Sequence, residues 1–367
     1  MNRQNDSFDN LNIIERNTAA PEICRRNKTG GVIKVLIAIV LILLTLVVGA
    51  TAAMVIMHQS GKKKMTTANE SVTMQSQTHA AVYDEGKTLE YKGQRYVLNE
   101  NLVTIACVGI DRREFGLVDG AVGTAGQADT VMLLAFDTQS GKTTVVSVPR
   151  DTMVDVNLYT ADGAFAGVEK NQLCLAFAYG DGKETSCENV VNSLERLFFG
   201  MPVTAYVAFE LDGIPNLNDA VGGITLTALE TVHKFTAGKT VTLYGEDALA
   251  YVRQRNSDRL DADALRRNRQ IQYIKAFAEK AISAVKNDFS VLSSLYEKAL
   301  AYSCTDITFS DVSFLASTFL ANNASFGNFV SIPGEYVANG NYAEFYADEE
   351  ALFELIVNIY YLPEVTE

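Results

Sequence analysis

Long apolar runs dominate the middle of the chain. Three runs between residues 102 and 149 are almost continuously apolar and are bounded by turn residues, which is typical of strands buried on both faces. Shorter runs of the same kind predict further strands. The three long runs are LVTIACVGI (102–110), TVMLLAFD (130–137) and TTVVSVP (143–149), and the shorter ones span 203–209, 224–229 and 330–333.

Apolar residues recur with helical spacing in the stretches between these strands. Positions three and four apart share one face of a helix, so this spacing predicts helices that pack on a sheet. Strands that alternate with helices indicate an α/β domain, which we expect to cover residues 98–363. The predicted helices span 186–199, 245–255, 263–284 and 311–321.

The amino-terminal part has a different pattern. Residues 1–31 are polar and read as a cytoplasmic tail, and 32–57 as a transmembrane helix, since 35–57 carry no charge and suffice to cross roughly 30 Å of hydrocarbon. A cleavable signal peptide is the alternative, because Ala50-Thr51-Ala52 has the small-x-small form. Basic residues before the helix outweigh those after it, which predicts a single-pass protein of the cell membrane with an extracellular carboxyl-terminal domain. Residues 58–97 read as a stalk.

Composition excludes several classes of function. The formal net charge of −13 argues against nucleic acid as a partner. The three histidines lie away from other reactive residues, which leaves little material for a Ser-His-Asp hydrolase. Gly141-Lys142-Thr143 lacks the preceding glycine of a phosphate-binding P-loop.

A cluster of arginines stands out in this acidic chain at 251–270. Guanidinium groups bind phosphate oxygens in two-pronged geometry, so the cluster indicates a phosphate site. The alternative is a solvated face paired with Asp258, Asp261 and Asp263. On the predicted helix, one face would carry Arg266, Arg269, Gln270 and Tyr273.

Two aspartates stand at strand boundaries. Asp111 follows the first long strand and Asp129 opens the second, so we expect both at one edge of the sheet. Paired carboxylates suit Mg²⁺, which takes its other ligands from water and phosphate; the alternative is that each aspartate only caps a turn. Gly120, Gly123 and Gly126 lie between them, but a strand follows rather than a helix, so we interpret this segment as a loop and not as a dinucleotide site.

Four of the cysteines lie in the predicted domain: Cys107, Cys174, Cys187 and Cys304. Four cysteines allow three pairings, and spacing does not choose among them. Cys107 lies mid-strand, which favours a buried thiol. A bridge between Cys174 and Cys187 stays open.

Several short segments occur together in the order found in one protein family. Taken together, the chain resembles the LytR-CpsA-Psr family of envelope polymer transferases over about residues 98–285. The segments are GID, ADTVML, VSVPRDT, KNQLCLAFAYGDG, LNDAVGG, GEDALAYVRQR and RRNRQ.

The resemblance implies a fold, an activity and a site. The fold would be an α-β-α domain with a central mixed sheet and an apolar lipid groove, for which Leu194, Phe198, Phe199, Val207 and Phe209 are candidates. The activity would move a glycopolymer of teichoic acid or capsule type, with its phosphate, from polyprenyl pyrophosphate to a peptidoglycan hydroxyl. The implied residues are Asp111 and Asp129 for Mg²⁺, Asp129, Arg150, Arg253 and Arg255 for catalysis, and Gln127, Arg266, Arg269 and Gln270 for substrate binding.

The chain departs from the family pattern at several places. Gln127 stands where the family usually has arginine, Leu265 where glycine is common, and the loop between the two aspartates is long. Two alternatives therefore stay open: a pyrophosphatase that releases polyprenyl phosphate, and a non-catalytic scaffold that holds the lipid-linked polymer. The sequence does not choose which group accepts the proton from the attacking hydroxyl.

Overall fold

The computed structural model describes residues 59–66, 80–112, 115–118, 120–254, 262–339 and 342–364. The expected cytoplasmic tail and transmembrane helix, and with them Arg255, lie outside the described residues. Residues from Met54 onward form one compact unit. Within the described ranges, no helix has both the length and the apolar character needed to cross a membrane.

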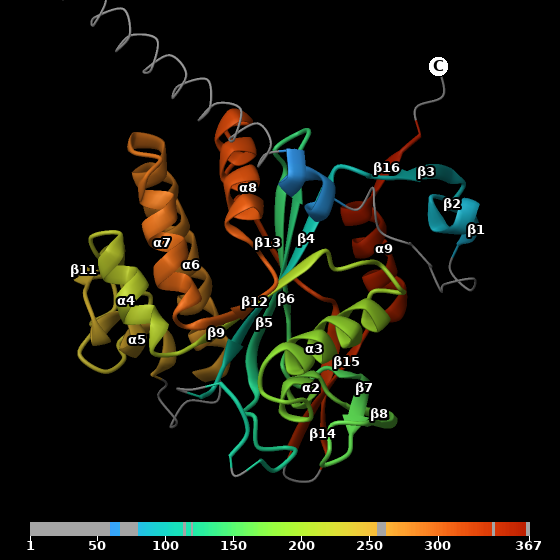
Figure 1. Cartoon of the computed structure of the whole chain (residues 1–367), viewed down its shortest axis with the longest axis horizontal. Coiled ribbons are helices and arrows are strands. Elements are labelled where there is room, and N and C mark those ends of the chain that lie inside the picture. The colour runs from blue at the N-terminus through green and yellow to red at the C-terminus, as the bar shows by residue number, and fades with distance from the viewer. Residues whose placement is uncertain are drawn as a thin grey trace, which may run out of the picture. The chain divides into compact units, whose positions relative to one another are not determined.

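A six-stranded sheet forms the centre of this unit, in the order β12-β9-β4-β5-β6-β13 (Figure 1). The pairs β4–β9 and β6–β13 are parallel and the others are antiparallel, so the sheet is mixed, as the resemblance implied. The strands are β4 (Leu102–Ile110), β5 (Ala128–Asp137), β6 (Thr143–Val148), β9 (Ala205–Glu210), β12 (Ser303–Thr305) and β13 (Asn328–Ser331).

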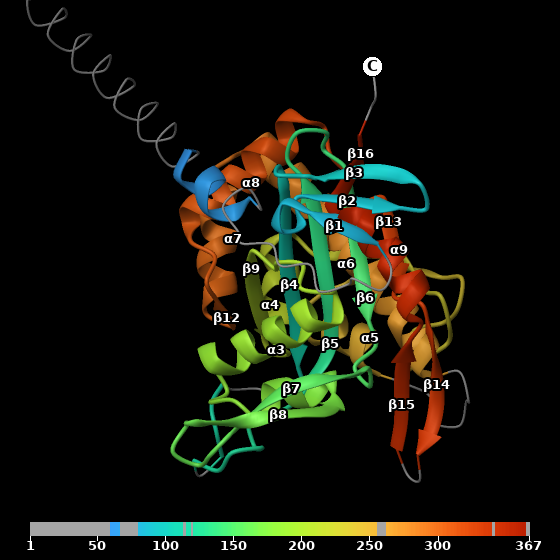
Figure 2. The same cartoon turned by 90° about the vertical axis from the view of Figure 1, so that its right-hand side faces the viewer.

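Helices cover both faces of the sheet (Figures 1 and 2). One face packs on α2 (Leu173–Ala178), α3 (Glu184–Leu197) and α9 (Glu349–Tyr360). The other packs on α6 (Ala262–Asn287), α7 (Val291–Leu300) and α8 (Phe309–Ala321). This arrangement explains why β4 is apolar at nearly every position: Ala106 contributes to one core and Ile105 to the other.

Smaller elements flank the sheet. The helices α4 (Gly213–Ala220) and α5 (Glu246–Arg253) share a separate core with the hairpin β10–β11. Two more hairpins, β7–β8 and β14–β15, lie at the same end of the sheet in Figure 2. The hairpin strands are β7 (Met153–Tyr159), β8 (Phe165–Gln172), β10 (Ile224–Thr227), β11 (Thr240–Leu243), β14 (Gly334–Asn339) and β15 (Tyr342–Ala347).

The expected stalk is partly folded into the domain. Residues 59–65 are helical, and Met65 is fully buried against the sheet. A second sheet has the order β1-β2-β3-β16, in which the last strand joins from the far end of the chain. Leu89 is fully buried there, so the boundary expected at residue 98 is wrong. The strands are β1 (Ala81–Tyr83), β2 (Thr88–Tyr91), β3 (Gln94–Leu98) and β16 (Tyr361–Pro363).

Candidate active site

The two aspartates lie together where the central strand β4 ends and β5 begins, as the sequence predicts. Strands β4 and β5 run antiparallel, so the end of one meets the start of the other, and Ile110 pairs with Ala128. The register shifts beside this pair, because Gly109 pairs with Thr130 and Asp129 has no partner of its own. Such a bulge turns a side chain out of the regular alternation. Asp129 thus leaves the regular strand pairing at the end of the sheet where Asp111 lies.

Gln127 ties the two aspartates together through its backbone. Its carbonyl accepts hydrogen bonds from the amides of Asp111 at 3.1 Å and Asp129 at 3.0 Å. Its own amide donates to Asp111 Oδ1 at 2.7 Å. Asp111 thus caps the end of the loop and also faces the site, so a capping role and a role in metal binding are compatible.

Gly126 makes this close approach possible. Its φ is +94°, a backbone conformation that side chains disfavour. A Cβ at this position would lie 2.9 Å from Asp111 Oδ1 and 2.6 Å from Arg112 Cδ. Glycine is therefore required sterically, and phosphate binding is not needed to explain it.

Arg150 lies directly beside the aspartates. Its guanidinium donates to Asp129 Oδ1, and Nη2 donates to Gln127 Oε1 at 2.6 Å. Nε also lies 3.5 Å from Asp151 Oδ1. The Arg150 side chain keeps 32% of its surface exposed, so it is held in place without being buried.

A cavity of about 470 Å³ opens next to these groups. Asp111, Asp129 and Thr130 line its sheet side, and Arg253, Arg266 and Gln270 line its helical side. The structure therefore brings together five of the residues that the sequence assigned to the site. We call this space the polar cavity.

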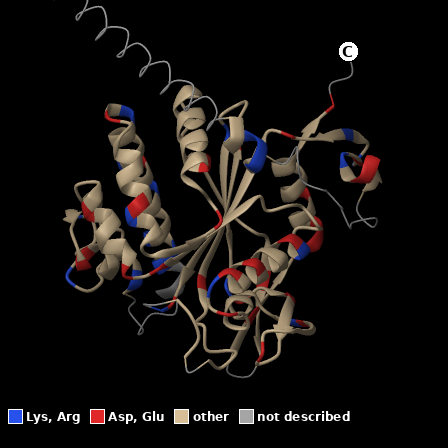
Figure 3. Cartoon of the chain, viewed as in Figure 1, with Lys and Arg blue, Asp and Glu red and all other residues tan. Residues whose placement is uncertain are grey.

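The helical wall comes from the end of α5 and the start of α6. Arg253 is the last residue of α5, where a positive charge is favourable beside the helix carboxyl end. Gln270 Nε2 donates to the carbonyl of Val252 at 3.3 Å and so joins the two helices. Burial raises the pKa of Tyr273, another lining residue, whose hydroxyl donates to Asn218 Oδ1 at 3.1 Å. In Figure 3, basic residues mark the ends of α5 and α6 nearest the site, while the central strands are mostly uncharged.

Arg269 does not belong to the polar cavity, so its expected role in substrate binding is wrong. Its side chain is fully buried, and Nε donates to Glu230 Oε1 at 2.8 Å. The other two nitrogens donate to the carbonyls of Tyr251 and Gln254. This guanidinium therefore holds the end of α5 against α6. Arg269 lies at the margin of the helix face that carries Arg266 and Gln270, where Glu230 and the end of α5 cover it.

Glu210 is a lining residue that the sequence interpretation missed. It ends β9, which is parallel to β4, and its register partner is Ile110. It is 8% exposed and lines the polar cavity beside Asp111. The signal was present in the sequence, since a single acid ends the apolar run 203–209 just as Asp111 ends the run before it.

The donors at this site fit Mg²⁺ only in part. Among the described residues, no group of three or more His, Cys, Asp or Glu side chains is arranged to hold a metal. Mg²⁺, however, is commonly held by one or two carboxylates, with water and substrate phosphates completing its shell. Asp111 and Asp129 match that smaller requirement. The hydrogen bonds described above end on Oδ1 of each carboxylate, so the second oxygen of each, Oδ2, can serve as a metal ligand.

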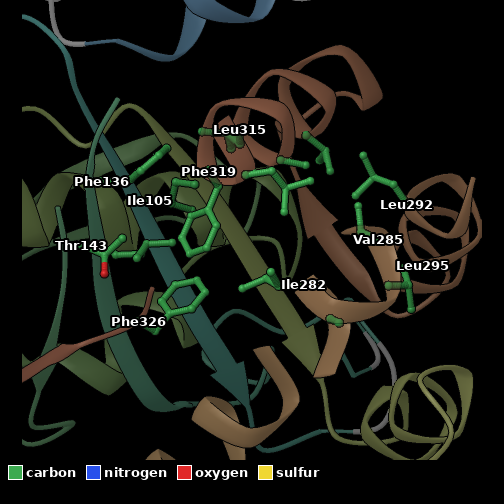
Figure 4. Close-up of a pocket in the computed structure, with 15 residues that line it drawn as sticks. Ile105, Phe136, Thr143, Ile282, Val285, Leu292, Leu295, Leu315, Phe319 and Phe326 are labelled. Atoms are coloured by element: carbon green, nitrogen blue, oxygen red, sulfur yellow. The ribbon is translucent and has the colours of Figure 1, made fainter. Parts of the chain in front are cut away.

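A second cavity of about 230 Å³ lies further along the same face of the sheet (Figure 4). Ile105 and Phe136 project into it from the sheet, and Ile282 and Phe319 from α6 and α8. Apolar side chains line almost all of it, so we call it the apolar cavity.

Both cavities lie under α6. The polar cavity is lined from α6 by Arg266, Gln270, Tyr273 and Ile274, and the apolar cavity by Ala281, Ile282 and Val285. On β4, Gly109 lines the first and Ile105 the second, a separation of about 13 Å along a strand. The arrangement offers one charged space and one apolar space within reach of a single long molecule.

The residues expected to line a lipid groove are mostly elsewhere. Leu194 and Phe198 are fully buried in the core on the opposite face of the sheet. Phe199 packs against that same core, and Val207 packs against the smaller core on the α8 side. Phe209 lines the polar cavity. The spacing of apolar residues identifies buried positions but does not tell which face of a sheet has space.

Comparison with known proteins decides the family. The model of the LytR_cpsA_psr family matches residues 55–358. The chain belongs to the LytR_cpsA_psr family. This confirms the resemblance seen in the sequence segments and extends it over most of the chain.

Relatives in the LytR_cpsA_psr family have named activities. The polyisoprenyl-teichoic acid–peptidoglycan teichoic acid transferase TagU of Enterococcus faecalis is 29% identical over 231 residues, which are 61% of this chain and 68% of that relative. The crystal structure of Bacillus subtilis TagV aligns with a TM-score of 0.56 at 23% identity, over 71% of this chain and 96% of the other. A structure of TagT bound to LI-WTA aligns with a TM-score of 0.52 at 20% identity, over 71% and 90%. The structural likeness confirms the α/β fold with a mixed sheet, and the relatives' names support a glycopolymer transferase.

Proposed function

We propose that this protein transfers a glycopolymer, together with one phosphate, from a polyprenyl pyrophosphate carrier to a hydroxyl of peptidoglycan. One observation carries the proposal: Asp111, Asp129, Arg253, Arg266 and Gln270 line one cavity, and an apolar cavity lies on the same face of the sheet. A lipid pyrophosphate has the same division into a charged head and an apolar tail. The names of the TagU and TagV relatives support this substrate class.

The pyrophosphate would occupy the polar cavity. Arg253 and Arg266 face it from the helices and bind its oxygens, which neutralises charge that spreads over them in the transition state. Arg150 is fixed by Asp129 and Gln127 at the edge of this space, so it is positioned before substrate arrives. A preorganised cation of this kind lowers the barrier without reorganising during the reaction.

The carboxylates have two roles in this proposal. Asp111 and Asp129 would hold Mg²⁺, which supplies Lewis-acid polarisation of phosphate oxygens when bound. Asp129 also receives a hydrogen bond from Arg150, which orients its carboxylate. The proton of the attacking hydroxyl leaves to a carboxylate at this edge of the sheet, where Asp111, Asp129 and Glu210 all line the cavity.

The polyprenyl chain would occupy the apolar cavity. Its lining of Ile105, Phe136, Ile282 and Phe319 removes apolar surface from water, at roughly 25 cal/mol per Å². This assignment places the lipid under α6, α7 and α8 rather than under α3. We further propose that the chain is anchored in the cell membrane by residues 32–57 with its folded unit outside, where both substrates are found.

The decisive experiment uses the full chain in detergent with a radiolabelled polyprenyl-pyrophosphate-linked glycopolymer. We expect Mg²⁺-dependent formation of a phosphodiester on peptidoglycan fragments, and loss of product in Asp129→Ala and Arg150→Ala. Product that forms equally without peptidoglycan would identify a pyrophosphatase. Lipid binding without turnover under any divalent metal would identify a scaffold and overturn the transferase.

A further inference from the structure

Two cysteines far apart in the sequence meet at one margin of the central sheet. Cys187 lies in the first turn of α3 and is 1% exposed. Cys304 is the middle residue of β12 and packs against the same hydrophobic core. Each of the two thiols is the largest influence on the other's pKa, which is raised at Cys187 and lowered at Cys304, so the two side chains are neighbours in this core. The contact joins residues that are separated by more than a hundred positions.

The sheet register explains why Cys304 faces α3. Strand β12 pairs antiparallel with β9, and Cys304 lies opposite Ala208. Directly opposed residues of an antiparallel pair point to the same face. Ala208 is fully buried in the core beneath α3, so Cys304 points to that core as well. Helix α3 and β12 are in direct contact, which brings Cys187 over it.

The other two cysteines of the domain have different surroundings. Cys107 packs with the core on the opposite face of the sheet, and burial raises its pKa to about 12. Cys174 Sγ lies 3.7 Å from Arg150 Nη2, beside the polar cavity. The structure therefore makes Cys304 the neighbour of Cys187, whereas the sequence left a bridge between Cys174 and Cys187 open.

We propose that Cys187 and Cys304 form a disulfide that links α3 covalently to the edge strand β12 when the protein meets a low-molecular-weight disulfide. The proposal does not depend on the transferase activity. The two cysteines lie on elements that contact each other and face one hydrophobic core, so little backbone movement is needed to close the bond.

The reaction is a thiol–disulfide exchange in two steps. The Cys304 thiolate attacks one sulfur of the small disulfide, forms a mixed disulfide and releases one small thiolate. Cys187 then loses its proton and attacks Cys304 Sγ, which releases the second small thiolate. The protein gives up two electrons and two protons, and the small disulfide is reduced to two thiols.

Cys304 is the better first nucleophile of the pair. It is partly exposed, whereas Cys187 is buried. The neighbouring Cys187 thiol lowers the pKa of Cys304, and Cys304 raises that of Cys187. A thiolate at Cys304 is therefore both easier to form and easier to reach.

The bond would fix an element that shapes the polar cavity. Strand β12 forms the edge of the sheet and pairs with β9. The end of β9 carries Phe209 and Glu210 into the cavity lining. A covalent link between β12 and α3 holds β9 between two fixed neighbours, β4 and β12.

Peptide mapping of the full chain tests the proposal directly. Cleavage after lysine and arginine places Cys24, Cys107, Cys174, Cys187 and Cys304 on five separate peptides. The protein would be incubated with oxidised glutathione, alkylated under denaturing conditions, digested without reductant and analysed by mass spectrometry. We expect one dominant cross-linked pair, 184–196 joined to 299–367, that disappears on reduction.

Variants separate this pair from other pairings. Cys187→Ser and Cys304→Ser should each abolish the cross-link, and Cys107→Ser and Cys174→Ser should leave it intact. A dominant Cys174–Cys187 cross-link, or Cys187 and Cys304 both remaining alkylatable after oxidation, would overturn the proposal.

Thermal unfolding provides a second measurement that does not rely on a variant's folding. The wild-type melting temperature should be higher by about 5 °C or more in oxidised glutathione than in dithiothreitol, since the bond closes a long loop. The same comparison in Cys304→Ser should show no difference. An equal melting temperature for the oxidised and reduced wild type would contradict a stabilising link.

Discussion

The polar and apolar cavities share a sheet face and a helix but differ in what holds them together. The polar cavity is built from hydrogen bonds: Gln127, Arg150 and Asp129 form one connected group at the sheet edge. The apolar cavity is built from packed side chains such as Phe136 and Phe319, whose rings lie 5.6 Å apart. Substitutions in the first should therefore change reaction rate, and substitutions in the second should change lipid affinity.

The largest expected effect is at the ion pair of the polar cavity. Asp129→Asn leaves the side chain's shape but removes its charge, so Arg150 and any metal lose their partner. We expect transfer to fall about 10³-fold, the size typical of removing a preorganised electrostatic group. Binding of the lipid substrate, measured by equilibrium dialysis, should change much less.

A matched control is Asp162→Asn, which neutralises an exposed aspartate in the turn between β7 and β8. It should leave transfer unchanged. If Asp129→Asn instead weakens lipid binding as much as it slows transfer, Asp129 stabilises the bound substrate and the transition state equally, and the proposed catalytic role is contradicted.

The next effect separates two arginines that are neighbours on α6. Arg266→Leu should lower transfer about 100-fold, because Arg266 lines the polar cavity. Arg269→Leu should instead lower the free energy of unfolding by about 3–5 kcal/mol, since it leaves Glu230 buried without its charge partner.

Urea unfolding and transfer assays on both variants check this distinction. A double variant, Arg269→Leu with Glu230→Leu, should recover part of the lost stability, because it removes both buried charges. Equal losses of stability in the Arg266 and Arg269 variants would mean that both arginines are structural, which would contradict the assignment of Arg266 to the polar cavity.

A smaller effect is expected from filling the apolar cavity. Ala316→Phe adds a ring to its α8 wall, so a long polyprenyl chain should bind about 10-fold more weakly, within the range for steric change in apolar pockets. A substrate analogue with a short lipid should be unaffected, and kcat should not change. Ala321→Phe, at an exposed position of the same helix, is the control.

The smallest effect is expected at Gln127. Gln127→Ala removes one hydrogen bond to the Arg150 guanidinium but keeps both backbone bonds to the aspartates. The loss of a bond worth about 1 kcal/mol should slow transfer roughly 5-fold. A loss as large as that of Asp129→Asn would mean that Gln127 contacts the phosphate itself.

Local patterns in the sequence predicted the layers of the fold and the carboxylates of the site. Continuous apolar runs are characteristic of strands covered on both sides, and an acid beside such a run marks a strand boundary, so Asp111 was found after one run and Asp129 before the next. Glu210 carries the same signal and was overlooked because its strand is not adjacent to the first in sequence.

Contacts between distant segments were not predictable in this way. Helical spacing placed Arg269 beside Arg266, but the position of Glu230, which decides its role, depends on tertiary packing. Strands β2 and β3 were assigned to a stalk because the strand that completes their sheet, β16, comes from the end of the chain. The pairing of Cys187 with Cys304 depends in the same way on the register of β12.

The backbone bonds of Gln127 have a consequence for how this family can diversify. They clamp the two ends of the loop that starts after Asp111, so the spacing of the carboxylates is set by the clamp and not by the number of residues between them. Lengthening a surface loop costs little, because the entropy of closure grows only slowly with length. Insertions can therefore accumulate in this loop between Asp111 and Asp129 while the spacing of the two carboxylates stays the same.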